Sequence, residues 1–527
     1  MSNIYKQGDN RKQQMFFPPS IDEYVSKDNQ VRAIDDYVEV LDVANLGFTN
    51  ATLLNTDGQP AYHPKLLLKI YIYGYLNKVR SSRKLEQEID RNIEMMWLCA
   101  GLKPRYKTIA NFRKDNATAL KKVFREFVLL CKELDLISGE LIAVDGAFLR
   151  ANASKNQLIM KKSVERDLKK IDEKISSYLE TLEFADKEEK KDKALKPLPT
   201  NNISKMSRRK EKLDKDLVLL EEMGVTQYNR TDPDAKVMVK PSHNLMAYNV
   251  QIAVDSKFKF IIATDVSSVG QDTNQLYNMA SKSQEILSKD KIDVTVDKGY
   301  YNTNNIKACI DNNITPYIPA PKYKQTSKDE RFKSDKFEYD KENDCYICPN
   351  NQMLVKASFT QKKKGRTNFV YRGTSTMCKS CPLRDKCLPQ KTATKSIYRW
   401  EHQELLNQHH TKMQTQEAKK IIKKRGSIAE HPFGTIKQHL GWSHFLVRGR
   451  KKVSGENALI MFSYNFRRLL NLMGIALFRK LIIALKEGNI EVIREEIVAY
   501  ITNLWCIWTN IILESLKILF PRKNISF

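Results

Sequence analysis

Residues 141–154 have the sequence LIAVDGAFLRANAS. Four apolar residues, from Leu141 to Val144, come directly before Asp145 and Gly146. A short apolar run that ends at a carboxylate is typical of a buried strand that carries a functional side chain at its end. We therefore predict a strand that begins at Leu141 and places Asp145 at its carboxyl end.

The same pattern returns in KIDVTVDKGYYN at residues 291–302, where a β-branched run ends at Asp297 just before Gly299. Between the two motifs, YNVQIAVD at 248–255 and FKFIIATDVSS at 258–268 predict a hairpin of strands. A helix is expected from about Asp272 to Leu287, and another helix and the strand-like ITPYIPA follow Asp297. Strands that alternate with helices predict an α/β domain, which we place at residues 137–475.

A compact all-α domain is expected before it, at residues 63–136, after an N-terminal extension over 1–62. Apolar residues recur there with helical spacing, which predicts helices at 64–76 and 83–99 and from about Thr108 to Leu134. The basic residues of these helices fit contact with DNA phosphates, and they fit a packing or dimerisation unit equally well.

Two insertions interrupt the predicted α/β domain. At 157–239, apolar residues recur at alternating spacings of four and three on both sides of a polar link, which predicts a charged helical hairpin with a structural or dimerising role. The second insertion, at 325–400, is rich in cysteine, and a C-terminal helical tail is expected at 476–527. The apolar positions of the hairpin are Val164, Leu168, Ile171, Ile175, Tyr178 and Leu182 in its first helix and Met206, Leu213, Leu217 and Leu220 in its second.

The composition favours a polyanionic partner. Among 527 residues, 89 Lys and Arg against 62 Asp and Glu give a formal net charge of +27, a surplus typical of proteins that bind nucleic acid. The first twenty residues lack the apolar core of a signal peptide, so we expect a cytosolic protein that does not span a membrane. Polar residues interrupt the apolar tail at 498–520, which favours an amphipathic or buried helix there.

Glu430 is the candidate for a third carboxylate, in the basic and mainly helical stretch KKRGSIAEHPFGTIK at 423–437. Two divalent cations about 4 Å apart assist phosphodiester chemistry, and Mg2+ and Mn2+ prefer oxygen ligands. Lys437 follows Glu430 by about two helical turns, so the two share a face if the helix is continuous. Pro432 requires either a first turn or a kink there.

These motifs, in this order, resemble the DDE transposases of bacterial insertion sequences, in the branch with an N-terminal helical transposase domain and a ribonuclease-H-like catalytic domain. The resemblance covers about His63 to Leu472. Its most specific stretches are VDGAFLRANAS around Asp145, AYNVQIAVD at 247–255, VDKGYYN around Asp297, and Glu430–Lys437 with RGRKKVSGENALIMFSYNFRR at 448–468.

The resemblance implies an α/β fold, a ribonuclease-H-like mixed sheet with flanking helices. It implies that Asp145, Asp297 and Glu430 are the catalytic triad and hold Mg2+ or Mn2+, and that Lys437 contacts DNA. Arg425 precedes Glu430 by one position more than in the family's Tyr, Arg, Glu and Lys signature, and Ile422 stands where that signature has its tyrosine. Arg425, Arg448 and Arg450 are the remaining DNA-binding candidates.

The activity implied is hydrolysis at the ends of the element, which exposes 3′-hydroxyls, followed by attack of those hydroxyls on target DNA. The partners would be double-stranded DNA, as terminal inverted repeats and as target, and further copies of the chain in a homo-oligomer. The location would be the bacterial cytoplasm, at the nucleoid when bound to DNA. Two alternatives stay open: a catalytically inactive DNA-binding protein, and a metal-dependent nuclease without strand transfer.

The cysteine-rich insertion contains CYIC at 345–348 and CKSC at 378–381. Two such pairs, with a strand-like FVYRG before the second, fit a structural Zn2+ bound by four thiolates, with free thiols as the alternative. Cys387 competes with Cys345, Cys348, Cys378 and Cys381 for one of the four places. QKKKGR at 361–366 is a further candidate for DNA contact. The isolated Cys99, Cys131, Cys309 and Cys506 are expected in the core.

Overall fold

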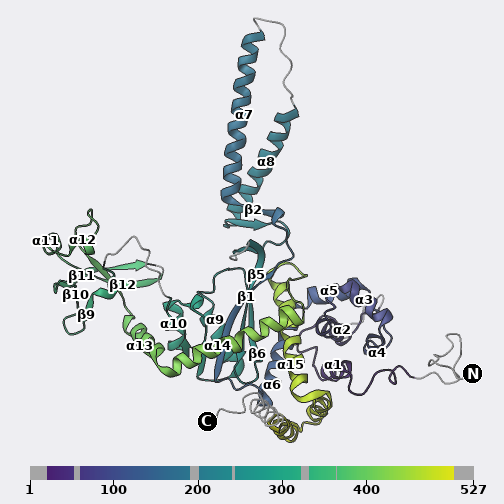
Figure 1. Cartoon of the computed structure of the whole chain (residues 1–527). Helices are drawn as coiled ribbons and strands as arrows, with labels where there is room; N and C mark the ends of the chain where they lie inside the picture. The colour runs from purple at the N-terminus through teal and green to yellow at the C-terminus, as the bar shows by residue number, and fades with distance from the viewer. Residues whose placement is uncertain are drawn as a thin grey trace, which may run out of the picture. The chain divides into compact units, whose positions relative to one another are not determined.

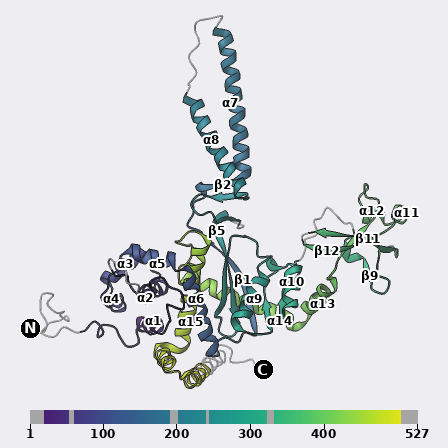
Figure 2. The same ribbon diagram turned by 180° about the vertical axis from the view of Figure 1, so that it is seen from behind.

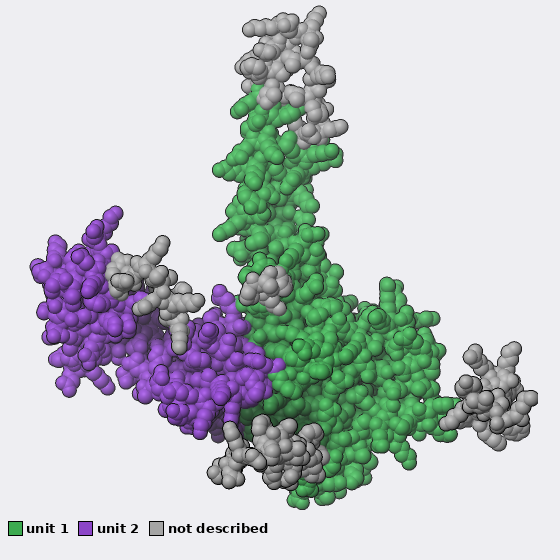
Figure 3. Space-filling view, viewed as in Figure 1, with its two compact units in different colours: residues 1–138, 146–270, 431–527 green, residues 139–145, 271–430 purple. Residues whose placement is uncertain are grey.

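The computed structural model describes residues 20–52, 60–189, 201–239, 244–321, 332–363 and 365–503. Its helices and strands are drawn from two sides in Figures 1 and 2. The chain divides into two compact units, coloured in Figure 3. Unit 1 comprises residues 1–138, 146–270 and 431–527, and unit 2 comprises residues 139–145 and 271–430.

The helical part of unit 1 is built around α15 (Arg450–Glu487), which is kinked at the non-helical Gly474 and packs against α1, α2, α5 and α6. Tyr37, Phe127 and Phe462 meet in this core, where the ring of Phe127 lies 5.4 Å from that of Tyr37 and 5.0 Å from that of Phe462. Buried aromatic rings contribute large apolar areas, so they hold the helices together. The other helices are α1 (Gln30–Glu39), α2 (Pro64–Leu76), α3 (Ser82–Arg91), α4 (Ile93–Leu98), α5 (Tyr106–Asp115) and α6 (Ala117–Glu133).

Two of the predicted helices are each divided in two. The helix predicted at 83–99 breaks at Asn92, whose backbone is extended and whose side chain accepts a hydrogen bond from the N–H of Glu94. The helix predicted from Thr108 breaks at Asn116, whose side chain bonds to the backbone of Thr49 and Phe112. Asparagine competes in this way for backbone groups and favours helix ends over helix interiors.

The strands of unit 1 form an antiparallel arrangement in which β5 (Asn244–Asp255) pairs with β4 (Lys236–Val239) and with β6 (Ile261–Ser267). The predicted β5–β6 hairpin is confirmed. Asn465 of α15 holds β6 by accepting from the N–H of Ile261 at 2.9 Å and donating to its carbonyl at 2.8 Å. The helical core of unit 1 is therefore joined to its strands by side-chain bonds to the backbone.

Helices α7 (Lys161–Glu189) and α8 (Asn201–Glu222) lie where the apolar spacing predicts them, and they form a hairpin (Figure 1). Val164 and Leu220 are buried at its base, packed by Leu168, Leu213 and Leu217. The short strands β2 (Leu158–Met160) and β3 (Gln227–Asn229) pair antiparallel at the base of the hairpin. A 3-10 turn at Lys155–Gln157 comes just before β2.

Unit 2 contains a parallel arrangement in which β7 (Ile292–Thr295) lies between β8 (Ile314–Tyr317) and the first half of β1 (Leu141–Arg150). Helices α9 (Leu276–Leu287) and α10 (Thr303–Asp311) pack against each other, and α10 packs against β8. Parallel and antiparallel strand pairs combined with helices give the mixed α/β fold that the sequence predicts.

The prediction that β1 ends at Asp145 is wrong. The strand continues to Arg150 within unit 1, where the N–H of Arg150 donates to the carbonyl of Ser443 and the N–H of Phe445 donates to the carbonyl of Arg150. Ala147 and Leu149 are buried, so the alternation of a strand persists past the carboxylate. A partner segment nearly 300 residues away in the sequence supplies these bonds, which local pattern does not reveal.

The cysteine-rich part of unit 2 forms a five-stranded antiparallel sheet in the order β13-β12-β11-β10-β9. Helix α13 (Gln403–Gln414) follows this sheet, and α14 (Gln416–Gly434) starts in unit 2 and ends in unit 1. The elements are β9 (Glu338–Asp340), β10 (Cys345–Ile347), β11 (Met353–Lys363), β12 (Arg366–Arg372), α11 (Ser375–Lys379), α12 (Arg384–Cys387) and β13 (Ser396–Trp400), with short 3-10 turns at Lys298–Tyr300 and Ser334–Lys336.

None of the helices within the described ranges is long and apolar enough to cross a membrane. The apolar tail discussed above lies outside these ranges from residue 504 onward, as do Cys506 and Lys364 of the QKKKGR stretch. Cys99, Cys131 and Cys309 are fully buried, as expected of core residues.

Candidate active site

Asp145 and Asp297 come just after the paired residues of two adjacent parallel strands in unit 2. The register pairs Leu141 with Asp293 and Ala143 with Thr295, and two further residues along each chain reach Asp145 and Asp297. Residues opposite each other in a sheet project from the same face, and neighbouring strands are about 4.8 Å apart. Val144 and Val296, just before the two carboxylates, are fully buried. The apolar runs thus fix the two aspartates at one edge of the parallel strands.

A tight turn orients Asp297. Its Oδ1 accepts a hydrogen bond of 2.6 Å from the N–H of Gly299, which caps the 3-10 turn Lys298–Tyr300. A Cβ atom on residue 299 would lie 2.9 Å from that oxygen, closer than such contacts normally come. Glycine is therefore required at 299 for the carboxylate to keep this position.

Helix α14 brings Arg425 and Glu430 to the same site. Nη1 of Arg425 lies 3.8 Å from Oδ1 of Asp145, and its Nη2 lies 3.6 Å from Oε1 of Glu430. The side chains of Arg425 and Asp145 are 19% and 23% exposed, whereas that of Glu430 is 68% exposed. Ion pairs at such partly solvated positions are weak, so the guanidinium is a counter-ion that a more strongly bound cation can replace.

The oxygen donors of Asp145, Asp297 and Glu430 suit Mg2+ or Mn2+ in chemistry and in their origin from two strands and a helix. Within the described ranges, however, no three His, Cys, Asp or Glu side chains are grouped so that they could hold a metal ion. Arg425 instead links two of the three carboxylates. For all three carboxylates to coordinate Mg2+ or Mn2+, at least the exposed side chain of Glu430 must change its conformation.

A histidine pair that sequence reasoning did not single out packs on the segment after Asp297. Nε2 of His410 on α13 lies 2.8 Å from the hydroxyl of Tyr301. Burial lowers the pKa of His410, and it lowers the pKa of the neighbouring His409 to about 4. Both imidazoles are therefore neutral near pH 7 and act as hydrogen-bonding rather than charged groups. The only local signal is the HisHis pair in an amphipathic helix.

The α-helix is not continuous from Glu430 to Lys437, which was the condition for the two residues to share a face. Pro432 lies inside α14, and the helix changes after Gly434 to a π-helix at Thr435–His439, which contains Lys437. Proline removes one helical hydrogen bond and clashes with the carbonyl four residues earlier, and a wider π turn is a common way to absorb such a disturbance. Lys437 is exposed in unit 1, with its Nζ 5.3 Å from the ring centroid of Phe433.

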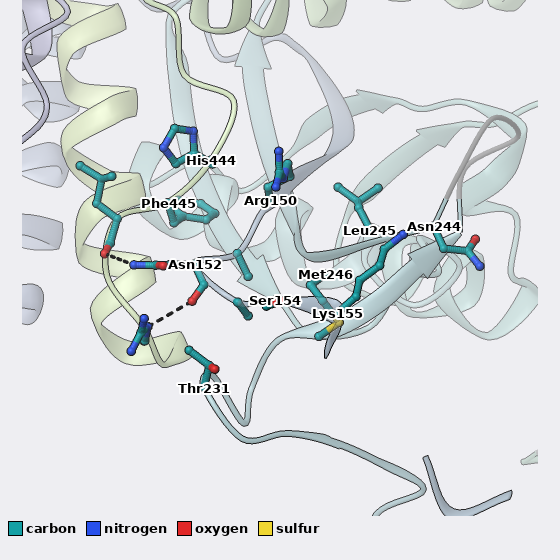
Figure 4. Close-up of a pocket in the computed structure, with 14 residues that line it drawn as sticks. Arg150, Asn152, Ser154, Lys155, Thr231, Asn244, Leu245, Met246, His444 and Phe445 are labelled. Carbon is teal, nitrogen blue, oxygen red and sulfur yellow. Dashed lines mark hydrogen bonds between the residues drawn. The ribbon is translucent and has the colours of Figure 1, made fainter. Parts of the chain in front are cut away.

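A basic pocket of about 790 Å³ lies in unit 1 beyond the end of β1 (Figure 4). Arg150, Lys155, His444 and Arg448 contribute its basic side chains. Nε of Arg448 donates to the carbonyl of Asn152, and Nδ2 of Asn152 donates to the carbonyl of Leu446, as the dashed lines show. Burial, reinforced by the guanidinium of Arg80, lowers the pKa of His444. The arginines and the lysine therefore supply the positive charge.

A buried carboxylate holds the segment that forms one wall of this pocket. Glu456 of α15 is fully buried, and its Oε2 accepts hydrogen bonds from the N–H groups of Leu446 and Val447 at 2.9 and 3.1 Å. Its Oε1 lies 3.4 Å from Nη1 of Arg113 and accepts from the hydroxyl of Tyr75 at 3.3 Å. Sequence reasoning missed Glu456 as a functional support, although a single carboxylate in the apolar run ENALIMF was the available signal.

The remaining predicted residues lie near this wall or in the cysteine-rich part. The N–H of Arg450 donates to Oδ2 of Asp234 at the start of α15, and the Arg450 side chain is exposed. In unit 2, Cys348, Cys378, Cys381 and Cys387 line one small cavity, whereas Cys345 does not.

Comparison with known proteins supports a single family. Residues 19–115 match the model "Transposase domain (DUF772)", and residues 347–470 match the model "Transposase DDE domain". No curated protein matches the chain significantly. A solved structure of a piggyBac transposase synaptic complex with hairpin DNA matches at 11% identity, covering 90% of this chain and 82% of that chain, with a TM-score of 0.27. The two transposase models match separate parts of the chain, and with the motifs around Asp145, Asp297 and Glu430 they identify it as a DDE transposase.

Proposed function

We propose that the chain cleaves the ends of an insertion sequence and joins the resulting 3′-hydroxyls to target DNA by metal-dependent phosphoryl transfer. The observation that carries the proposal is the bridge from Arg425 to Asp145 and Glu430, together with a strand pairing that ends two residues before Asp145 and Asp297. Two aspartates that follow neighbouring strands and a glutamate on a helix are the ligand set expected of a ribonuclease-H-like catalytic domain.

The three carboxylates would hold the cations, and they would approach them from different elements of the fold. Asp145 and Asp297 would bind from the strand side, and Glu430 would complete the ligand set from α14. Bound Mg2+ or Mn2+ would activate the attacking oxygen and stabilise the leaving oxygen. Arg425 would then be released from the carboxylates and be available to a phosphate oxygen, for which a guanidinium is well suited.

DNA would be held through its phosphates. Lys155 and Arg448 in the basic pocket, with Lys437 and Arg450, are the candidates for these contacts, which give affinity but little sequence information. Double-stranded DNA as partner, assembly of two or more protomers on paired ends, and a place at the bacterial nucleoid belong to the same proposal. The domain limits predicted from the sequence remain part of it too.

The test uses purified protein and labelled duplexes that carry the DNA flanking the gene for this chain, in Mg2+ or Mn2+. We expect metal-dependent nicks and joined products from the unmutated protein. Asp145→Asn or Asp297→Asn should abolish both while leaving DNA binding in place, because a metal ligand is lost and the basic contacts are not. Asp290→Asn is the matched control, since it makes the same chemical change at an exposed position of unit 2.

Three outcomes separate the alternatives. Nicks without joined products would indicate a nuclease. Binding without either product would indicate an inactive DNA-binding protein. Cleavage that persists in Asp145→Asn or Asp297→Asn would remove that residue from the active site.

A further inference from the structure

The cysteine-rich part of unit 2 contains a cavity of about 30 Å³ that is lined by Cys348, Cys378, Cys381 and Cys387. This volume is about that of a single water or ion. Apolar side chains, among them Phe337, Leu354 and Met377, line the rest of it. The four thiols come from three separate places along the chain, so their convergence on one small space is a property of the fold and not of a local motif.

We propose that these four cysteines bind one Zn2+ ion, and that Cys345 is not a ligand. The proposal changes the set that the sequence favours, in which Cys345 and Cys348 act as a pair. It does not depend on the transposition chemistry proposed above, so either proposal can fail without the other.

Strand geometry excludes Cys345 from the cavity. Side chains alternate between the two faces of a strand, and Tyr346 pairs with Leu354, which lines the cavity, so Cys345 projects to the opposite face of the sheet. Tyr346 lies in the hydrophobic cluster against which Cys348 and Cys387 pack. Cys345 therefore lies apart from the thiols that line the cavity.

Cys387 occupies the place that Cys345 leaves. It ends α12 and lines the same cavity as Cys348, Cys378 and Cys381. Thiolates repel one another in such a group, and a divalent cation among them removes that repulsion and favours the deprotonated forms.

The backbone comes close to two of the proposed ligands, Cys348 and Cys378. The N–H of Gln352 donates to Sγ of Cys348 at 3.4 Å, within a tight turn in which the N–H of Asn351 donates to the Cys348 carbonyl. A hydrogen bond to sulfur favours the thiolate. A Cβ atom at Gly373 would lie 3.0 Å from Sγ of Cys378, so the glycine allows the strand to pass close to that thiol.

Positive charge lies beside the cavity. Lys395 and Arg384 are among the residues that line it, and Nη1 of Arg384 donates to the carbonyl of Cys378. A zinc ion with four thiolates is a dianion, which these two cations would balance. Since no described group of three ligands is already gathered for a metal, binding requires the cysteine side chains to turn toward a common centre within the cavity.

The experiment measures metal content and coordination in the full chain, purified under reducing conditions without chelator. We expect stoichiometric zinc by elemental mass spectrometry. After replacement by Co2+ we expect the thiolate charge-transfer and d–d absorption of a tetrahedral site. Cys387→Ser should lose the stoichiometric metal or the four-thiolate spectrum, whereas Cys345→Ser, the matched control, should keep both.

Pulsed alkylation of the unmutated protein gives an answer that does not depend on whether the variants fold. Cys348, Cys378, Cys381 and Cys387 should gain reactivity together when zinc is removed by a chelator. The proposal is overturned by an unmutated protein that binds neither zinc nor cobalt. It is also overturned by a Cys345→Ser variant that loses the metal while Cys387→Ser keeps it, or by a Cys387 thiol that reacts equally fast with and without chelator.

Discussion

At the scale of single residues, the site depends on how two aspartates are held at neighbouring strand positions. The paired stretch of β1 and β7 ends two residues before Asp145 and Asp297, and Asp297 is held by a turn through the N–H of Gly299. Asp145 lies within a strand that continues to Arg150, and its charge is balanced by Arg425. The two carboxylates are therefore oriented by different means, and they should respond to different substitutions.

Gly299→Ala should move the Asp297 carboxylate without removing it. The added Cβ would come within 2.9 Å of Asp297 Oδ1, so that oxygen or the turn must shift. Small displacements of a reacting group can cost up to about a hundredfold in rate, and we expect cleavage to slow by roughly tenfold or more. The measurement is the single-turnover rate of DNA cleavage, with DNA affinity determined in parallel.

Gly434→Ala is the control for that substitution. It adds the same atom at a helical glycine that has no neighbour within 4 Å of the new Cβ. Its cleavage rate should equal that of the unmutated protein. A Gly299→Ala variant that also cleaves at the unmutated rate would mean that the turn does not set the position of Asp297.

Residues whose role depends on adjacent sequence could be predicted, and residues whose role depends on distant partners could not. The apolar runs before Asp145 and Asp297 are local, so both aspartates were accessible to pattern reasoning, although their placement beside each other needed the register. The choice of Cys387 over Cys345 depends on which face of a sheet each thiol occupies. The bridge by Arg425 depends on the packing of α14, and its spacing from Glu430 alone gave no strong signal.

At the scale of elements, one buried carboxylate joins three helices to the wall of the basic pocket. Glu456 of α15 lies beside Arg113 of α5 and Tyr75 of α2, and it accepts from two backbone N–H groups of the segment that precedes Arg448. Helix periodicity predicted α2 as an element. It could not predict that a charge inside α15 fastens a loop, because that requires the tertiary contact.

Glu456→Gln should destabilise the protein by about 3 to 5 kcal/mol, the range for breaking a buried ion pair by removing one partner. The Arg113 guanidinium, only 7% exposed, would be left without a charged partner. Asp311→Asn is the control, since its i,i+4 pair with Lys307 is 45% exposed on the carboxylate side and should contribute less than about 1 kcal/mol.

The measurement is the free energy of unfolding in denaturant, followed by the helical circular-dichroism signal of the whole chain. Equal losses for Glu456→Gln and Asp311→Asn would show that the buried network contributes no more than a surface pair. Replacing both Arg113 and Glu456 by apolar residues of similar volume should recover part of the loss, because no buried charge then remains unpaired.

At the scale of the whole molecule, the net charge of +27 and the transposase family lead to the same expectation about DNA. Charge excess was visible in the composition, but the place where it forms a binding surface was not. The structure places Arg150, Lys155 and Arg448 around one pocket, although Arg448 lies nearly 300 residues from the other two in the sequence. Composition thus predicted the class of partner, and tertiary structure was needed for the candidate surface.

If this pocket binds DNA phosphates, its basic side chains should contribute to the salt dependence of binding. DNA affinity should fall steeply as salt rises, and Arg448→Ala or Lys155→Ala should each weaken binding and reduce the slope of log affinity against log salt by about 1, because one fewer counterion is released. Lys307→Ala, on α10 of unit 2 and paired with Asp311, should leave the slope unchanged. Affinity measured by fluorescence anisotropy over a series of salt concentrations tests this. An Arg448→Ala slope equal to that of the unmutated protein would place the DNA contacts elsewhere on the basic surface.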